Sequence, residues 1–506
     1  MGCFLGAASN APKRRFVVTN YKTRRHVTLK LNRILLAAYI VGVFFVTSTV
    51  AQEASPPDQS PPQAAQSTGD NPLAEQLPGA KQTAVSPHTG GTDPNLPQPD
   101  SKAEALSAGQ QLSSQDSEHV VQKQYTTPDV PRKSKEYTGY NGKYISARLG
   151  LVLVADYTAF SQDADSISQV GIQQDQWDDR ALRFLLFGGI GPQSYRVGYF
   201  VSYEWNGFDA PQNKKPSWDF TDLSFAFPVG TLGALTVGKT KEHFGYEIDG
   251  DATFLPQDER ILNPFFTARD VGVILTNAVL TKRMTYSAGW FNDWWAHGRP
   301  FDGTSNHYTA RVTGLISISE DGSRYLHLGV DARYVGATNG FIRLQGRPES
   351  NVASNYIDTG KIAASNEKEF GLEALWTRGR YSILAEYNLA QVNATQVANP
   401  SFYGLYITGS WVVTGEHRPY DRNVGYARRI IPQRHFGAIE LVGRYSRLDL
   451  DDKSVHGGIL DKGYFGVNWF LNRRWKVGEG IGIASLDRAG LHGLTSIYLT
   501  RIQFVY

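Results

Sequence analysis

Between residues 143 and 506 the chain is built from segments of about ten residues in which apolar and polar side chains alternate. In one such segment Val201 and Tyr203 point to one face of an extended chain, while Ser202 and Glu204 point to the other. A period of two residues indicates β-strands, because successive side chains of a strand lie on opposite faces. This part of the chain has no run of about 18 apolar residues that would form a transmembrane helix.

The residue types on the two faces narrow the choice of fold. One face tends to carry aromatic side chains at its ends and aliphatic ones between, as lipid-facing strands do, and the other carries Arg, Glu, Asp and Gly. A soluble β-sandwich also alternates, but without this arrangement. The predicted fold class is all-β, a transmembrane antiparallel β-barrel of about 16 strands that encloses an aqueous channel. The predicted strands start near residues 143, 181, 193, 218, 231, 269, 281, 306, 323, 366, 380, 400, 434, 462, 474 and 493.

The links between the predicted strands differ in length. Short links such as 191–193 and 378–379 alternate with long ones such as 339–366, as periplasmic turns alternate with external loops in outer-membrane barrels. One long link, residues 415–434, falls where the count requires a short one. We therefore expect the number of strands to be wrong by one somewhere in the second half of the predicted barrel.

The third long external loop lies between the predicted strands 231–240 and 269–276. A link of this length without a period of its own is normally functional. It is rich in charged residues and also carries apolar side chains that can pack it down, namely Phe244, Tyr246, Phe254, Phe265 and Phe266. We predict that this loop folds inward and narrows the channel. The alternative is an ordinary surface loop packed outside the barrel.

The N-terminal part of the chain consists of two stretches that differ in composition from the predicted barrel and from each other. Residues 1–51 combine a basic stretch, an apolar run and small residues, which predicts a cleaved signal peptide. Its removal takes away eight Lys and Arg residues and changes the formal net charge from +3 to −5, which disfavours nucleic-acid binding. Residues 52–136 are rich in Pro, Gln and Ser and predict a disordered periplasmic linker. The predicted barrel domain covers residues 137–506.

Catalytic and metal-binding motifs are absent from the sequence. No two histidines have the spacing His-x-x-x-His, and the only cysteine, Cys3, lies in the predicted signal peptide. His327 and Asp331 share a strand face, but a metal site needs a third ligand that the sequence does not offer. We therefore predict no catalytic residue, no metal and no cofactor. An outer-membrane hydrolase with its catalytic residues near the rim stays as a less favoured alternative.

Several stretches resemble the phosphate-selective porin O and P family. They are TVGKTKEHFG at residues 236–245, NPFFTARDVGVIL at 263–275, MTYSAGWFND at 284–293 and YTARVTGL at 308–315, and the closing block GAIELVGRYSRLDLDD at 437–452 with GGILDKGYFGVNWFLNRRWKVG at 457–478. The resemblance covers the predicted barrel and omits the linker. It implies a sixteen-stranded porin that forms a homotrimer, with the third loop in the lumen.

The same resemblance implies which residues bind solutes. Lumen arginines and lysines bind anions in this family, so the candidates for binding inorganic anions such as phosphate are Arg148, Arg180, Arg183, Lys239, Lys241, Arg260 and Arg269. The local charges do not favour anion binding, because residues 239–270 contain four basic and seven acidic residues. For each candidate the alternative is a lumen or rim charge balanced by a neighbouring carboxylate.

The last strand ends on an aromatic residue, Tyr506, as outer-membrane barrels commonly do. We expect the barrel-insertion machinery to bind this end and the outer-membrane lipids to surround the barrel. The predicted function is a porin of the bacterial outer membrane that lets small hydrophilic solutes diffuse. A structural or adhesion barrel with a plugged lumen is the main alternative.

Overall fold

The computed structural model describes residues 139–205, 217–250, 256–257 and 259–506. The predicted signal peptide, the predicted linker and Phe254 lie outside the described residues. Within those ranges, no helix combines the length and the apolar composition needed to cross a membrane.

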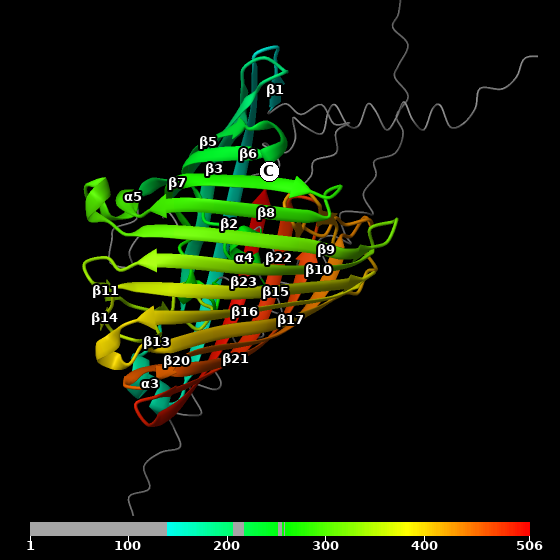
Figure 1. Ribbon diagram of the computed structural model, residues 1–506. Helices are drawn as coiled ribbons and strands as arrows, with labels where there is room; N and C mark the ends of the chain where they lie inside the picture. The colour runs from blue at the N-terminus through cyan, green and yellow to red at the C-terminus, as the bar shows by residue number, and fades with distance from the viewer. Residues whose placement is uncertain (1–138, 206–216, 251–255, 258) are drawn as a thin grey trace, which may run out of the picture. The chain divides into compact units, whose positions relative to one another are not determined.

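Seventeen antiparallel strands form one sheet, and sixteen of them close into a ring in which each strand pairs with the next along the chain (Figure 1). The first and last strands of the ring pair from Val152 with Val505 to Gln162 with Thr495, which closes the barrel. The additional strand β1, Gly139–Asn141, pairs with the beginning of β2. The prediction of a 16-stranded antiparallel barrel is confirmed. The ring consists of β2 (Ile145–Gln162), β3 (Gln176–Ile190), β4 (Val197–Trp205), β5 (Trp218–Pro228), β6 (Ala234–Lys241), β7 (Arg269–Val279), β8 (Met284–Asn292), β9 (Asn306–Ile318), β10 (Arg324–Gly336), β15 (Asn366–Arg378), β16 (Tyr381–Asn393), β17 (Ser401–Val412), β20 (Ala438–Asp452), β21 (Val455–Phe470), β22 (Trp475–Arg488) and β23 (Leu491–Val505).

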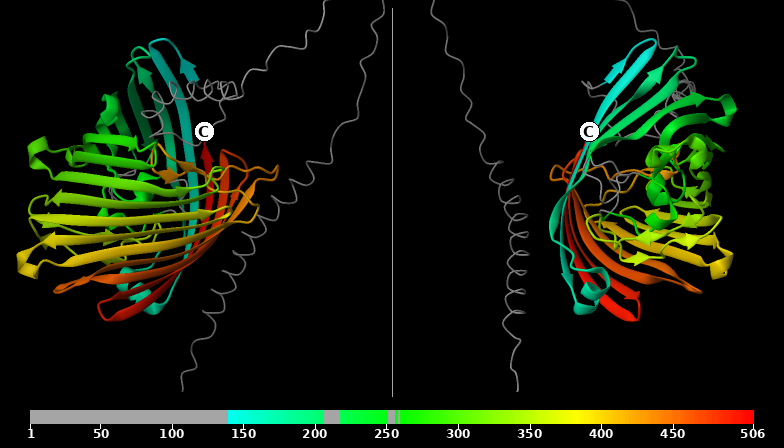
Figure 2. Two further views of the ribbon diagram at one scale, coloured as in Figure 1. Left: turned by 45° about the vertical axis from the view of Figure 1, so that its right-hand side comes forward. Right: turned by 90° about the vertical axis from the view of Figure 1, so that its left-hand side faces the viewer.

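The two faces of each strand differ as the alternation predicts, and β15 illustrates it. On the outer face Phe370 and Leu372 are 54% and 57% exposed, whereas on the inner face Glu369 and Glu373 are 1% and 3% exposed. An apolar outer band and a polar interior are the arrangement that a lipid bilayer around an aqueous lumen requires. Figure 2 shows the same ring from two further directions.

The predicted number of strands is correct, and the expectation that it was wrong by one is itself wrong. The long link 413–437 joins β17 directly to β20, at the barrel end where the other links are short. Conversely, two links at the opposite end are only two residues long, 453–454 and 489–490. The start of β21 was predicted near residue 462 but lies at Val455. The prediction missed this part of the strand because Gly457 and Gly458 interrupt the apolar alternation there.

Shorter elements lie in the links. The helices are α3 (Ala164–Val170), α4 (Tyr246–Asp249) and α5 (Trp294–His297), with 3-10 turns η1 (Gly230–Leu232), η3 (Asn263–Phe265), η4 (Phe301–Gly303) and η5 (Thr395–Val397). The short strands pair as β11 (Phe341–Ile342) with β14 (Ile362–Ala363), β12 (Gln345–Gly346) with β13 (Ile357–Asp358), and β18 (Tyr420–Asp421) with β19 (Tyr426–Ala427). Three of the links contact the inner wall and form the candidate site.

Candidate functional site

The first of these links is the β6–β7 segment, residues 242–268, which contains α4. Its backbone turns at Gly245, where a φ of 82° favours glycine, and then offers three amides to the barrel wall. The amide of Gly245 donates to Asp331 Oδ1 on β10 at 3.1 Å. The amides of Tyr246 and Glu247 donate to the two carboxylate oxygens of Glu386 on β16 at 2.5 and 3.0 Å. Two wall carboxylates thus hold the start of α4.

Charged side chains reinforce this attachment. Arg444 on β20 pairs with Glu247 at 2.5 Å, and Arg311 on β9 pairs with Asp249. Arg333 on β10 contacts Glu242 at 2.7 Å. Burial would raise the pKa of the Glu242 carboxyl, but the charges of Arg333 and His307 outweigh it and lower that pKa to about 2. Glu242 therefore binds Arg333 as an ionised carboxylate at neutral pH.

Apolar side chains from both ends of the same segment also attach it. Phe244, Ile261, Leu262 and Phe265 are at most 1% exposed and belong to one cluster with wall residues such as Phe402. Burying each of these side chains contributes about 1.5–3 kcal/mol. Tyr246 is also buried and Phe266 is partly buried, so the described members of the predicted apolar set are packed.

The β10–β15 segment, residues 337–365, lies beside the β6–β7 segment. Arg347 pairs with Glu259 at 3.0 Å, and Glu349 accepts from the guanidinium of Arg444 at 2.9 Å. Arg444 therefore binds one carboxylate from each segment, since it also holds Glu247. Its guanidinium lies 3.7 Å from the ring centre of Tyr406, a cation–π contact.

The third link, the β17–β20 segment (residues 413–437), begins and ends at the opposite barrel end. It contains the β18–β19 pair, and its Tyr420 hydroxyl lies 2.7 Å from His327 Nδ1 on β10. Burial raises the pKa of Tyr420 well above its usual range, so this hydroxyl stays protonated. Gly425 of the β17–β20 segment packs against the side chains of Thr285 and Thr313. A β-carbon on Gly425 would lie 2.6–2.7 Å from the two hydroxyl oxygens. The amide of Ala427 donates to the Tyr246 hydroxyl at 2.9 Å.

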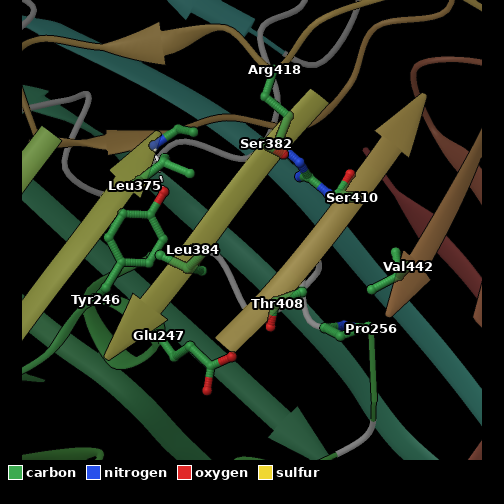
Figure 3. Close-up of a pocket in the computed structure, with 12 residues that line it drawn as sticks. Tyr246, Glu247, Pro256, Leu375, Ser382, Leu384, Thr408, Ser410, Arg418 and Val442 are labelled. Atoms are coloured by element: carbon green, nitrogen blue, oxygen red, sulfur yellow. Dashed lines mark hydrogen bonds between the residues drawn. The ribbon is translucent and has the colours of Figure 1, made fainter. Parts of the chain in front are cut away.

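A cavity lies where these segments meet the wall (Figure 3). Its volume is about 70 Å³. Apolar groups such as Leu375, Leu384 and Val442 form part of the lining, and the hydroxyl-bearing residues Ser382 and Thr408 lie between them. Arg418 also lines the cavity, and its guanidinium is paired with Glu440. The cavity offers hydroxyl groups and apolar surface, but no cluster of bases.

The predicted basic candidates do not form one row. Four of them contact acceptors of the protein itself. Arg183 pairs with Glu204 at 2.7 Å and Arg269 with Asp222 at 2.9 Å. Arg260 donates to the backbone oxygen of Glu247 at 3.0 Å, and burial lowers the pKa of its guanidinium to about 10. Lys241 donates to the backbone oxygens of Asp249 and Gly250 at the end of α4, at 3.3 and 2.9 Å.

The other three candidates are Lys239, Arg148 and Arg180, and Arg180 lies close enough to Arg260 for their charges to interact. Lys239 pairs in register with Leu223 and Val271, and its ammonium lies 5.2 Å from the ring centre of Trp295. Arg148 on β2 is exposed and Arg180 on β3 is half-buried. The wall residues that hold the β6–β7 segment were not among the candidates predicted from the sequence, namely Arg311, Arg333, Arg444 and Glu386. Their inward position in the alternation is the only signal the sequence carries for them.

One group of described residues has the composition of a metal site, namely Glu242, Asp270 and His307. Arg333 lies within it, 2.7 Å from Glu242 and 3.3 Å from His307 Nδ1. The guanidinium supplies the positive charge that a metal ion would supply, so we assign no metal there. His327, which shares a strand face with Asp331, also contacts groups of the protein. It lies 2.8 Å from Glu373 on the wall and contacts Tyr420 of the β17–β20 segment.

A closed ring of sixteen amphipathic strands with charged groups and long segments on its inner wall defines a channel protein of the bacterial outer membrane. The model of the family "Phosphate-selective porin O and P" matches residues 157–478, and the chain belongs to that family. It is an outer-membrane porin, through which small hydrophilic solutes diffuse.

Individual relatives are distant. Porin O of Pseudomonas aeruginosa is 22% identical over 407 residues, which cover 72% of this chain and 89% of that protein. An uncharacterized protein of Caulobacter vibrioides is 31% identical over 157 residues, and the match covers only 31% of its length and 29% of this chain. Among solved structures, OmpT of Vibrio cholerae has a TM-score of 0.47 at 10% identity, covering 73% of this chain and 99% of that one. An anion-selective porin from Comamonas acidovorans has a TM-score of 0.44 at 12% identity, covering 72% and 100%.

Proposed function

We propose that this porin is a general diffusion channel whose narrowest part lies where the β6–β7 and β17–β20 segments meet. The observation that carries the proposal is the contact between Tyr246 and Ala427, which joins segments that start from opposite ends of a closed barrel. A solute that crosses the lumen must pass beside this contact. The constriction is attached to the wall by Asp331 and Glu386, so its width is fixed by hydrogen bonds.

We further propose that the channel has no preference for phosphate. Arg183, Arg269 and Lys241 are bound by acceptors of the protein, which leaves less positive potential for a passing anion. Buried carboxylates also outnumber buried Lys and Arg among the described residues, eighteen to eleven. Selectivity follows from the charges that line the narrowest ring, and here these charges largely compensate one another.

Single-channel recording in planar bilayers tests both statements. We expect stepwise conductance, a reversal potential in a potassium chloride gradient that does not favour chloride, and no block of the current by inorganic phosphate. Chloride preference with phosphate block would contradict the proposed selectivity while leaving the channel in place.

A structural barrel with a plugged lumen is the second candidate. The extent of the apolar cluster favours it, because Phe244, Phe265 and Tyr356 fill interior space and are fully buried. Liposome swelling with sugars of increasing size separates the candidates. A plugged barrel gives no swelling and no conductance, although it inserts normally.

We also infer that the chain is not an enzyme and that it forms a homotrimer, as the family resemblance implies. One outward feature supports a protein contact. Glu479 lies on the outer face of β22, two residues from Ile481, which is 39% exposed, and accepts from Thr500 at 2.8 Å. A carboxyl group facing lipid is costly, so a neighbouring protomer is the better environment. The mass of the purified detergent complex should equal three chains, and Glu479→Lys should lower it to one.

A further inference from the structure

A cleft opens at the barrel end where the links are short, which faces the periplasm in outer-membrane barrels. It lies where β9, β10 and β15 meet, three neighbours in the ring (Figure 1). Its volume is about 390 Å³, and sites for small ligands span about 300–1,000 Å³. Part of its lining is polar or aromatic, namely Ser317, Ser319, Arg324, Trp376 and Arg378. The cleft shares no residue with the cavity at the constriction.

Two arginines of the cleft lie directly opposite each other. Arg324 on β10 pairs in register with Arg378 on β15, and both side chains are exposed. Directly paired residues point to the same face of a sheet, with β-carbons about 4.5–5.5 Å apart. Like charges in this arrangement repel each other and destabilise the pairing. An anion between the two guanidinium groups would remove this repulsion.

The neighbouring carboxylates do not neutralise these two charges. Among the described residues, neither guanidinium makes an ion pair, although Glu320 and Asp321 lie in the turn between β9 and β10. Asp321 is near enough to Arg324 for their charges to interact. Its oxygens, however, accept hydrogen bonds from the hydroxyl groups of Ser319 and Ser323. The cleft therefore keeps an excess of positive charge.

The position of the cleft along the strands places it at the membrane surface. On the outer face of β10 and β15, the residues further from the turns are apolar and exposed, such as Leu328, Val330 and Leu372. Trp376 ends this apolar band, and Tyr381 pairs in register with Arg378. Trp and Tyr are enriched where the hydrocarbon of a bilayer meets the lipid headgroups. The two arginines therefore lie at the level of the headgroups.

The chemistry of the lining selects the kind of headgroup. A guanidinium binds phosphate oxygens through two parallel N–H groups, which makes arginine well suited to phosphate. A phosphodiester has two unesterified oxygens and one negative charge, so it can accept from both arginines at once. The exposed Ser317 adds a hydroxyl donor beside them. Acyl chains attached to the same phosphate would extend along the apolar band that begins at Trp376.

We propose that this cleft binds the phosphodiester headgroup of an anionic phospholipid from the periplasmic leaflet, held between Arg324 and Arg378. The site lies on the outer face and goes beyond the proposed channel function, because no solute in the lumen reaches it. It is also compatible with the proposed trimer. The outer face of β22, which carries Glu479, lies five strands further around the ring than β15.

Two double variants of the full-length protein test the site. Arg324→Gln with Arg378→Gln removes both charges of the cleft. Arg434→Gln with Arg473→Gln is the matched control, because it removes two exposed arginines from the same barrel end but outside the cleft. Heat-modifiable mobility on gels and single-channel conductance should match wild type for both variants, which confirms that the barrel is folded.

The first measurement is native mass spectrometry of the detergent-solubilised protein during titration with phosphatidylglycerol. Wild type and the control should retain one lipid per chain, and the cleft variant should bind it about thirtyfold more weakly, since each arginine near an anionic lipid contributes about tenfold or slightly less. Equal affinity of the cleft variant and the control would overturn the inference, because it would mean that the lipid responds only to the overall charge of this barrel end.

The second measurement needs no variant. The unfolding temperature of wild type in mixed micelles should be higher with phosphatidylglycerol than with phosphatidylcholine, whose choline group cancels the phosphate charge, because a ligand of the folded state stabilises it. Inorganic phosphate at the same concentration should raise the temperature little. Equal temperatures with the two lipids would contradict the site. An increase with inorganic phosphate as large as that with phosphatidylglycerol would contradict a lipid as its occupant.

Discussion

The hydroxyl group of Tyr246 accepts a hydrogen bond of 2.9 Å from the backbone amide of Ala427, 181 residues further along the chain. Tyr246 begins α4 in the β6–β7 segment, and Ala427 ends β19 in the β17–β20 segment. Both residues belong to a buried cluster with Leu315, Tyr325 and Leu375 of the wall. The position of each segment therefore depends on the other, and changes at their contact should alter the pore.

Tyr246→Phe tests this dependence. The substitution keeps the ring in its apolar cluster but leaves the amide of Ala427 without its acceptor, at a cost of about 1–3 kcal/mol. We expect a larger mean conductance and stronger current fluctuations in single-channel recordings. Tyr445→Phe is the control, because the Tyr445 hydroxyl binds Asp461 at an exposed position. Identical traces for the two variants would mean that the contact does not control the pore.

Glu386→Ala removes the carboxylate that receives the amides of Tyr246 and Glu247. Each of these hydrogen bonds contributes about 0.5–1.5 kcal/mol, so α4 should detach from the wall while the barrel persists. Limited proteolysis should then cut within residues 242–268, and heat-modifiable mobility should be retained. Glu479→Ala on the outer face should leave this segment resistant. Resistance of both variants would show that the apolar cluster alone holds the segment.

The pH dependence of the pore should follow Glu242. Its pKa is lowered from 4.5 to about 2 in the folded protein, so its contribution to stability is complete above about pH 4.5 and is lost as the pH falls towards 2. The groups around it are Arg333, His307 and Asp270. The full shift corresponds to a stabilisation on the order of 3 kcal/mol. We expect conductance to change between pH 4.5 and 2 as the segment loosens.

Two variants complete the pH experiment. Glu242→Gln should show, already at pH 7, the conductance that wild type reaches in acid. Asp321→Asn should keep the wild-type profile, because Asp321 lies in an exposed turn and binds only neighbours such as Ser319 and Ser323. A wild-type profile for Glu242→Gln would show that another group controls the acid response.

Lys239 and Lys241 should differ although they lie two residues apart. The ammonium of Lys241 caps α4, whereas that of Lys239 lies 5.2 Å from the ring centre of Trp295. Lys241→Gln should shift the reversal potential in a salt gradient towards cations, and Lys239→Gln should shift it little. Equal shifts would mean that both lysines act on the pore from the same face.

Deletion of residues 504–506 should prevent assembly. Val505 is the last residue of β23 to pair with β2, and the amide of Tyr506 donates to Leu151 at 2.8 Å. Without these contacts the ring lacks part of its closing ladder. The protein should accumulate as periplasmic aggregate, measured by fractionation. Leu491→Ala, at the other end of β23, should still yield membrane-inserted barrel.

The sequence by itself determined the barrel, its strand number and most of its strand starts, because alternation depends only on the residues within each strand. The predicted starts at 218, 269, 306 and 366 coincide with those of β5, β7, β9 and β15. The start of β21 was missed because glycines carry no apolar signal. The long link 413–437 was recognised as long, but its contacts with Tyr246 and His327 depend on residues far away in the chain.

The tertiary structure decided which charged side chains pair with each other. Arg444 and Glu247 are 197 residues apart, and no local pattern announces their pairing. Asp331 lies in register with Gly371, and Gly371 with Asn388, so these residues share a face only through the register of β10, β15 and β16. A shift of one residue would turn one of them to the lipid. A sequence gives the parity of each side chain within its strand. Which carboxylate then meets which cation across the lumen depends on closure of the ring, because closure sets the distance between strands that are remote in the chain.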